Sequence, residues 1–166
     1  MAFVRLLTPS AAFTSVQFHP DGHLLAAGTI DGQIKLFDVK SGMQAATFAL
    51  GGRIQMLRFS ENGIWLAAVS ESSSTISIWD LRKMAEIKSL DTGGSRVESI
   101  DWDYTGQFLL IGGPEGVAVQ QYSKSTKAWT EPLRSATPAV AVAWASGAHQ
   151  AVTLDHEGRL TVLGAS

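Results

Sequence analysis

Short runs of alternating hydrophobic and polar residues recur along the whole chain. Four of these runs end in an aromatic residue, at Phe18, Phe59, Trp102 and Trp144, with differences of 41, 43 and 42 residues. A polar turn that carries a glycine follows each aromatic residue, and then comes a short apolar run such as LLAAG or WLAAV. Alternation predicts a strand, and a glycine turn between two such runs predicts a hairpin. The chain therefore contains four related units.

Each unit predicts more than one hairpin. A second turn rich in Gly or Ser leads to a third run, IKLFD in the first unit and ISIWD in the second. The first three units end with a fourth run, MQAATF, AEIKSL and AWTEPL. Four strands repeated every ~40 to 45 residues are typical of a β-propeller blade. We therefore expect an all-β fold that forms about four blades of an incomplete β-propeller.

The ends of the chain suggest how the propeller continues. The blades are expected at residues 13–50, 53–92, 95–135 and 137–166, and residues 1–12 at the place of the outer strand of a preceding blade. The last unit has no fourth run, whereas Ala2–Leu7 offer a spare strand. Propellers close when an N-terminal segment completes the last blade. We expect the chain either to be part of a larger ring or to pair head to tail with a second copy by strand exchange.

Composition narrows the classes of protein that fit. The chain has no cysteine, which excludes a disulfide framework and favours an intracellular protein. A net charge of −2 gives no general attraction to nucleic acid or to acidic membranes, and no apolar run is long enough to cross a bilayer. With 45% hydrophobic residues the chain can bury a core.

Several short motifs resemble a known family. The pair Trp79–Asp80, with Phe37–Asp38 at the matching point of the first unit, is the dipeptide of WD repeats. The words FHPDG, GTIDGQIKLFDVK, FSENG, WDLRK, GQFLLIGG and WTE closely resemble the C-terminal propeller of the pre-mRNA-processing factor 19 family, from about Phe13 to Leu163. The resemblance implies a seven-bladed propeller in a nuclear U-box ubiquitin ligase of the spliceosomal NineTeen complex.

The same resemblance implies a function for the chain. It indicates a platform that recruits spliceosomal complex subunits or ubiquitylation substrates for pre-mRNA splicing and DNA repair. The catalytic U-box and the coiled coil that makes the parent protein a homo-tetramer are absent from these residues. A generic WD-repeat scaffold of another complex, and a propeller that contacts RNA, stay open as alternatives.

The chain departs from the WD pattern at the positions that normally form a buried polar network. Asp31 stands six residues before Phe37, but phenylalanine has no indole N–H to donate. Trp79 is present in the second unit, where Ser73 replaces the acid. We therefore expect these blades to depend on packing more than on a polar network.

No grouping of residues indicates catalysis, a metal or a cofactor. His19, Asp21 and His23 lie in a turn that recurs without histidine, so a turn-capping or surface role is expected. Asp101 and Asp103 flank Trp102 on one strand face, and they are interpreted as solvated acids because no partner base accompanies them. A propeller enzyme would need a cluster of acids and histidines at matching positions of successive repeats. The sequence shows no such recurrence.

The two sets of turns at opposite ends of the predicted blades differ in charge. The turns between second and third strands carry acids, and Arg53 and Arg96 enter the first strands at this same end. The turns between third and outer strands carry bases. The candidate partner-binding residues are therefore Asp31, Glu71, Glu115, Arg53 and Arg96 at one end, and Lys40, Arg82, Lys83, Lys124 and Lys127 at the other. The basic end predicts contact with an acidic peptide or an RNA backbone.

Overall fold

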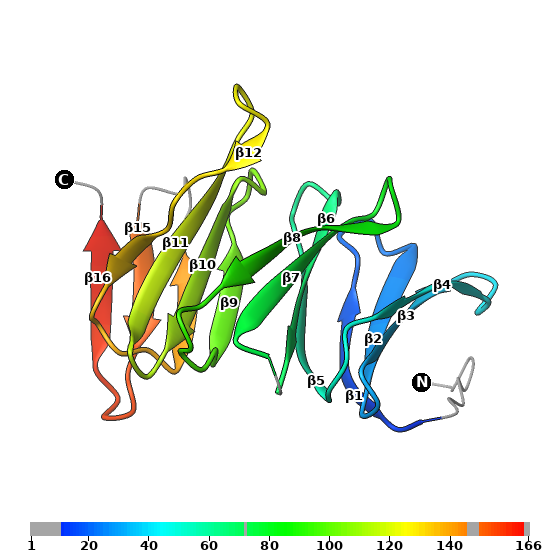
Figure 1. Ribbon diagram of the computed structural model, residues 1–166, viewed down its shortest axis with the longest axis horizontal. Helices are drawn as coiled ribbons and strands as arrows, with labels where there is room; N and C mark the ends of the chain where they lie inside the picture. The colour runs from blue at the N-terminus through cyan, green and yellow to red at the C-terminus, as the bar shows by residue number, and fades with distance from the viewer. Residues whose placement is uncertain (1–10, 72, 146–149, 165–166) are drawn as a thin grey trace.

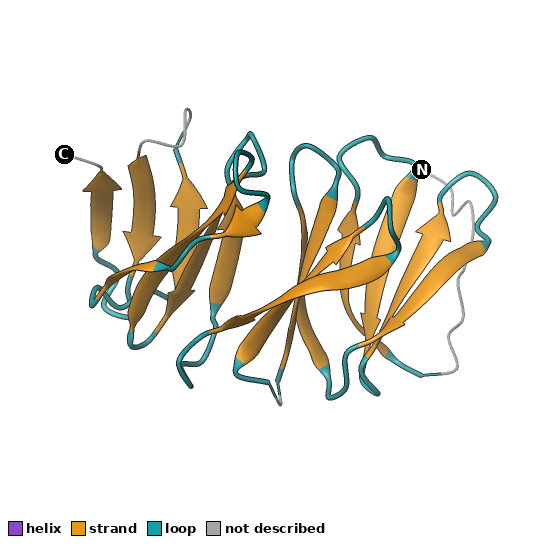
Figure 2. Ribbon diagram, turned by 45° about the horizontal axis from the view of Figure 1, so that its top comes forward, coloured by secondary structure: helices purple, strands orange, loops and turns teal. Residues whose placement is uncertain are grey.

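A computed structural model describes residues 11–71, 73–145 and 150–164 of the chain. These residues form strands and turns without a helix, and the strands make four antiparallel sheets side by side (Figures 1 and 2). The first sheet contains β1 (Phe13–Phe18), β2 (Leu24–Thr29), β3 (Gln33–Asp38) and β4 (Gln44–Ala49). The second contains β5 (Ile54–Phe59), β6 (Trp65–Ser70), β7 (Thr75–Asp80) and β8 (Ala85–Asp91).

The other two sheets differ from this four-stranded pattern. The third contains β9 (Ser99–Trp102), β10 (Phe108–Gly113), β11 (Gly116–Ser123), β12 (Ala128–Trp129) and β13 (Leu133–Ser135). The fourth contains β14 (Ala141–Trp144), β15 (Gln150–Leu154) and β16 (Leu160–Gly164). The expected all-β propeller of about four blades is confirmed, and the four sheets do not close into a ring. The expected outer strand at Ala2–Leu7 lies outside the described residues.

Glycines make the recurring turns between first and second strands. Gly22, Gly63 and Gly106 have φ angles of 73°, 69° and 67°, in the left-handed region that favours glycine. An amide N–H in each turn closes it onto a carbonyl three residues earlier, as Gly63 does onto Ser60 at 2.8 Å. The glycine that marked each of these three polar turns in the sequence is therefore required by the backbone conformation.

The outer strand of the third sheet corrects one expectation. The run AWTEPL was predicted as one strand, but the structure divides it into β12 and β13, which pair with opposite ends of β11. Pro132 has no N–H to donate to a neighbouring strand, and it interrupts the pairing between the two pieces. The β11–β12 hairpin projects from one end of the sheet (Figure 1).

The hydrophobic core lies between neighbouring sheets. Ile34 and Leu36 of β3 are fully buried against Leu57 and Phe59 of β5 and their neighbours. The second sheet packs against the third in the same way, and the third packs against the fourth. Phe18 is exposed although it matches the buried Phe59, because none of the described sheets lies against the outward face of β1. Each sheet of the described chain thus depends on its neighbour for burial.

Side chains of the first strands also connect neighbouring sheets. The Thr14 hydroxyl donates to the Ile54 carbonyl at 2.6 Å, and the Trp102 indole N–H donates to the Arg58 carbonyl at 3.1 Å. The sheets are therefore joined by hydrogen bonds at their inner strands as well as by apolar packing.

Candidate partner-binding surfaces

One end of the molecule carries the predicted arginines. The Arg53 Nε atom lies 3.6 Å from Glu71 Oε1, and the Arg96 Nε atom lies 3.6 Å from Glu98 Oε1. Both arginine side chains are at least half exposed. Exposed ion pairs contribute only about 0 to 1 kcal/mol, so Arg53, whose partner Glu71 is 54% exposed, can exchange this partner at little cost. The partner of Arg96 differs, because the Glu98 side chain is only 16% exposed.

The structure brings four of the predicted residues to the junction of the second and third sheets. A polar hollow of about 330 Å³ is lined by both Glu71 and Arg96, and Arg53 pairs with Glu71 at its side. A smaller hollow of about 80 Å³ adjoins it and is lined by Arg96 and Glu115. The Ser95 hydroxyl donates to Glu115 at 3.2 Å. We call Arg53, Glu71, Arg96 and Glu115 the arginine face.

Arg134 belongs to the same region, and sequence reasoning missed it. Its guanidinium donates to the Asp91 and Thr92 carbonyls at 3.4 and 3.5 Å and lines the smaller hollow beside Arg96. Arg134 stands directly after the predicted outer run AWTEPL, and the structure places it in β13, beside the second sheet. Asp31, by contrast, is hydrogen bonded to Thr29 within its own turn.

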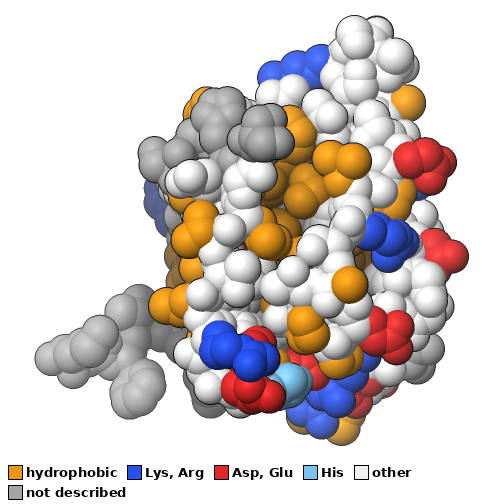
Figure 3. All heavy atoms as spheres, turned by 90° about the vertical axis from the view of Figure 1, so that its left-hand side faces the viewer, with side chains coloured by type: hydrophobic (Ala, Val, Ile, Leu, Met, Phe, Trp, Pro, Cys, Tyr) orange, Lys and Arg blue, Asp and Glu red, His pale blue; other side chains and the backbone are white. Residues whose placement is uncertain are grey.

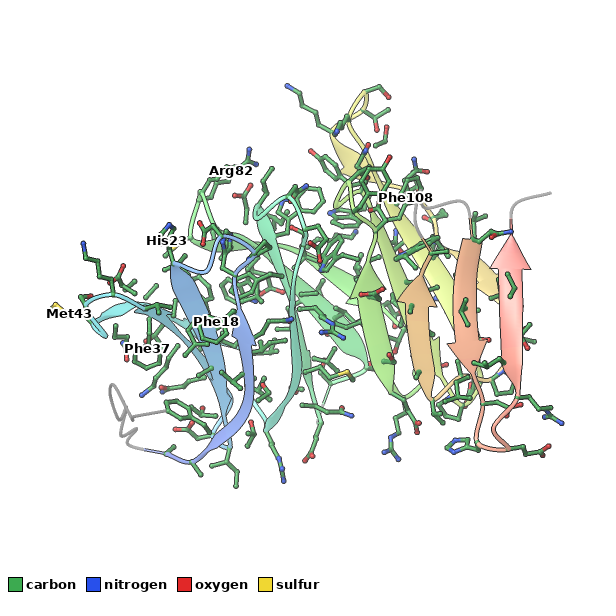
Figure 4. All side chains as sticks on the ribbon, turned by 180° about the vertical axis from the view of Figure 1, so that it is seen from behind. Phe18, His23, Phe37, Met43, Arg82 and Phe108 are labelled. Atoms are coloured by element: carbon green, nitrogen blue, oxygen red, sulfur yellow. The ribbon has the colours of Figure 1, made fainter. Side chains whose placement is uncertain are left out.

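The opposite end carries the predicted basic residues. Four lysines are exposed in the turns that follow the third strands, and we call them the lysine rim: Lys40, Lys83, Lys124 and Lys127. Arg82 differs from them because its guanidinium donates to Asp80 Oδ2 at 2.7 Å. Figure 4 shows the side chains of Arg82 and His23 at this end of the molecule. Asp80 therefore neutralises part of the predicted basic end.

The two WD-position acids cap the turns after β3 and β7. Asp38 accepts hydrogen bonds of 2.6 Å from the Ser41 amide and hydroxyl, and these bonds lower the pKa of Asp38. Asp80 is buried, and the Arg82 guanidinium holds its pKa below the ordinary value. Asp80 also accepts from the Arg82 and Lys83 amides. These acids fix the turns that present the lysine rim.

Replacing Asp80 with asparagine is expected to lower the free energy of unfolding by about 2 kcal/mol, because charge-assisted bonds to Arg82 are lost in a buried position. Since the folded pKa of Asp80 lies below its unfolded value, its contribution is full above about pH 4 and disappears as pH falls through the folded pKa. Urea unfolding at pH 7 and at pH 3 measures both effects.

Glu86→Gln on the exposed surface of β8 is the matched control and should change stability by less than about 0.5 kcal/mol at either pH. An Asp80→Asn variant as stable as this control at pH 7 would contradict the capping role.

The WD-position aromatic residues pack rather than form a polar network. Trp79 stacks on Phe48 of β4, with ring centroids 4.3 Å apart and an angle of 10° between planes. Its buried indole nitrogen has no hydrogen-bond partner within the described residues. Phe37 meets Phe13 edge to face at 6.1 Å. Packing therefore holds these positions in both sheets.

The histidine and aspartate candidates have structural roles. His19 Nε2 lies 2.9 Å from the Gly63 carbonyl of the next sheet, and His19 Nδ1 lies 2.8 Å from Asp21. The interpretation of Asp101 and Asp103 as solvated acids was wrong. Asp103 is fully buried and accepts from the amides of its own turn, such as that of Phe108 at 2.7 Å, while Asp101 accepts from the Trp144 amide of the fourth sheet at 2.9 Å.

Metal-binding clusters and membrane-spanning helices were sought among the residues that the structure describes. Over the ranges that the structure covers, no three His, Asp or Glu residues are grouped so that they could hold a metal ion. The same ranges include no helix with the length and apolar character needed to cross a membrane.

Comparison with known proteins places this arrangement among WD-repeat propellers. The sequence profile of the Anaphase-promoting complex subunit 4 WD40 domain matches residues 7–62. Pre-mRNA-processing factor 19 of Schizosaccharomyces pombe is 30% identical over 160 residues, which cover 95% of this chain and 33% of that protein. The Dictyostelium discoideum protein of the same name is 39% identical over 60% of this chain and 20% of its own length. These matches confirm the resemblance that the motifs indicated.

Other known proteins are similar to this chain as well. Small ribosomal subunit protein RACK1 of Caenorhabditis elegans is 35% identical over 69% of this chain and 37% of its own length. A chain in the crystal structure of the Mitotic Checkpoint Complex superposes on 95% of this chain and 51% of its own, with a TM-score of 0.76 and 19% identity. The chain thus spans about a fifth to two fifths of the length of these relatives in sequence.

Proposed function

We propose that this chain, a four-sheet segment of a WD-repeat β-propeller similar in sequence to Pre-mRNA-processing factor 19, is a protein-interaction platform of a splicing-associated assembly. The observation that carries the proposal is the match over 95% of the chain to a protein named for pre-mRNA processing. Propeller turns project from a rigid scaffold, and this suits them to bind partner proteins without catalysing a reaction. On this proposal the chain acts in the nucleus.

A finer role rests on what the resemblance implies. The segment would recruit spliceosomal complex subunits or ubiquitylation substrates to a U-box ubiquitin ligase, with roles in splicing and DNA repair. The U-box and the coiled coil of such a ligase are not among these 166 residues, so this segment would supply recognition and another segment the transfer of ubiquitin.

The arginine face is the surface that we propose for the partner. Arginine is enriched among the residues that dominate protein interfaces, and its planar guanidinium binds carboxylates through two parallel hydrogen bonds. Arg53 and Arg96 are exposed, they flank a polar hollow, and their Nε atoms lie 3.6 Å from the nearest carboxylate oxygens. A partner segment that carries acidic residues fits this arrangement.

The lysine rim favours a second candidate function, contact with RNA. Its four lysines project at one end of the molecule from three successive turns. Lysines in such a row can follow a phosphate backbone, and such binding weakens steeply as salt rises.

Reversing the charge of the arginine face should remove the partners of the platform. We expect the variant Arg53→Glu with Arg96→Glu to retain less than about a tenth of the spliceosomal proteins that the unchanged chain captures from nuclear extract, since each lost arginine contact costs about 1 to 2 kcal/mol or more. Quantitative mass spectrometry of the captured proteins gives the measurement.

The matched control is the variant with all four lysines of the lysine rim changed to glutamate, which should capture the same proteins as the unchanged chain. Captured proteins from another complex, lost in the same arginine variant, would instead support a generic WD-repeat scaffold. Loss of capture in the lysine variant, together with salt-sensitive binding of a 20-nucleotide oligouridine by the unchanged chain, would favour the RNA candidate.

A further inference from the structure

Arg134 differs from most of the described arginines because no carboxylate of the described residues pairs with it. Its guanidinium donates to the Thr92 and Asp91 carbonyls at 3.5 and 3.4 Å, which is long for hydrogen bonds of an N–H group. Ion pairs with carboxylates form at four other arginines, namely Arg53, Arg82, Arg96 and Arg159. Neutral groups thus hold Arg134 against the second sheet, and no acid in the part of the chain that the structure describes neutralises its charge.

The two acids that line the smaller hollow with Arg134 are engaged elsewhere. Asp91 Oδ1 accepts from the Gly93 amide at 2.8 Å, so this carboxylate caps its own turn. Glu115 accepts from the Ser95 hydroxyl at 3.2 Å. Neither acid forms an ion pair with Arg134. A carboxylate that neutralises Arg134 therefore has to come from outside the described residues.

A second arginine lines the same hollow. Arg96 lies in the segment before β9, and its side chain is 73% exposed. The short strand β13 brings Arg134 to the junction of the second and third sheets, beside Arg96. The planar guanidinium of each arginine can give two parallel hydrogen bonds to a carboxylate or a phosphate. The hollow is therefore a place where one anionic group can contact two arginines.

A larger space that Arg134 also borders does not suit an anion. It is a groove of about 550 Å³ whose other lining residues are largely apolar, such as Val117, Val119 and Leu133. Figure 3 looks onto this end of the molecule and shows hydrophobic side chains gathered in a hollow. An ionised group in apolar surroundings loses water without gaining hydrogen-bond donors. An anion that pairs with Arg134 is thus bound on the side of the smaller hollow, where Arg96 lies.

Size and charge select a carboxylate for the smaller hollow. Its volume is about 80 Å³, whereas a cavity that holds benzene measures about 150 Å³. The end of one short acidic side chain therefore fits, and an aromatic ring does not. Two bases and two acids line the hollow, namely Arg96 and Arg134 with Asp91 and Glu115. A carboxylate adds one negative charge, whereas a phosphate adds about 1.5 to 2 and is repelled more strongly by both acids.

We infer that the smaller hollow binds the carboxylate of one Asp or Glu side chain of the partner protein, between Arg134 and Arg96. This inference rests on the proposed function of the arginine face, and it adds Arg134 to the residues that bind the partner. Recognition then depends on one acidic side chain at a fixed position of the partner segment, rather than on the net charge of that segment.

Arg58 provides a matched control for Arg134. The Arg58 Nε atom donates to the Ile100 carbonyl of the next sheet at 3.4 Å, so Arg58 also joins two sheets through a neutral carbonyl. Arg58 lines a hollow of about 330 Å³, and the described residues around that hollow include Glu98 but no second arginine or lysine. Arg58→Gln and Arg134→Gln therefore remove the same kind of contact between sheets, and only Arg134→Gln removes an arginine from the inferred carboxylate site.

Nitrogen-15 NMR of the 166-residue chain tests the site with three capped peptides that differ at one position: acetyl-Gly-Glu-Gly-amide and its glutamine and phosphoserine counterparts. The glutamate peptide should shift the Nε–H signals of Arg96 and Arg134. It should bind about tenfold more tightly than the glutamine peptide, since charge-assisted hydrogen bonds are about twice as strong as neutral ones. Arg134→Gln should remove this advantage, and Arg58→Gln should leave it unchanged. The same spectra show whether each variant is folded.

Arg96→Gln is the second variant, at a side chain that is 73% exposed, and it should weaken binding of the glutamate peptide in the same way. Equal binding of the glutamate and glutamine peptides would overturn the inference. Binding of the glutamate peptide that is unchanged in both Arg134→Gln and Arg96→Gln would overturn it as well. A phosphoserine peptide that binds about tenfold more tightly than the glutamate peptide would overturn the choice of a carboxylate.

Capture from nuclear extract separates this inference from the proposed function. We expect Arg134→Gln to capture fewer spliceosomal proteins than the unchanged chain, and Arg58→Gln to capture the same amount. Binding of the glutamate peptide through Arg134, without capture of any spliceosomal protein by the unchanged chain, would refute the proposed function alone. Normal capture by Arg134→Gln, with no preference of the unchanged chain for the glutamate peptide, would refute the inference alone.

Discussion

Replacing Trp79 with alanine is expected to lower the free energy of unfolding by about 3 to 5 kcal/mol, which is the usual range for a buried tryptophan. The Trp79 ring is buried in the core between the first two sheets and stacks on Phe48 of β4. Its removal leaves a cavity that strands fixed by hydrogen bonds on both edges can close only in part. Urea unfolding followed by circular dichroism measures the loss without depending on tryptophan fluorescence.

The companion variant Trp79→Phe separates packing from hydrogen bonding. Because the Trp79 indole nitrogen has no partner within the described residues, phenylalanine keeps an aromatic ring over Phe48 and removes a buried donor. We expect a change of less than about 1 kcal/mol, since loss of packing volume and loss of the unpaired donor oppose each other.

Trp102→Phe is the matched control for that comparison. The Trp102 indole donates to the Arg58 carbonyl at 3.1 Å, so phenylalanine at this position removes a real hydrogen bond and should cost about 1 to 2 kcal/mol more than Trp79→Phe does. Equal losses in the two variants would show that Trp79 has a polar partner after all.

The repeat period predicted the fold because every sheet reuses one strand pattern. The registers Leu25↔Phe37 and Leu66↔Trp79 are 41 to 42 residues apart, as the aromatic spacing requires. The outer strand of the third sheet did not follow the period, because a single proline within it outweighs its alternation.

The arginine face could be predicted only in part. Its residues were found from their place in turns, but their partners come from contacts between repeats, which a period does not specify. Arg134 contacts carbonyls 42 and 43 residues away, and Asp101 accepts an amide 43 residues away. Such a contact depends on which polar residue stands at one position in one repeat, so a pattern shared by all repeats does not reveal it.

Gly113→Ala is expected to destabilise the chain by about 2 to 3 kcal/mol and to weaken partner binding at the arginine face. A Cβ atom on Gly113 would lie 2.1 Å from the Arg96 carbonyl oxygen, and a backbone atom cannot rotate away as a side chain can. The strand end at Gly113 and the segment that carries Arg96 must therefore separate. Urea unfolding measures the loss of stability, and capture from nuclear extract measures the loss of binding.

Gly158→Ala distinguishes this steric effect from the general cost of replacing a glycine. Gly158 has a φ angle of 78° and open space where a Cβ would lie, so alanine there should cost only about 1 kcal/mol of backbone strain and leave partner capture unchanged. If Gly113→Ala lost stability yet captured its partners normally, the position of Arg96 would not depend on this close approach. If stability and capture fall together in Gly113→Ala, the close approach of the Gly113 end of β10 to the Arg96 backbone both stabilises the third sheet and positions Arg96, which couples the fold to the proposed binding surface.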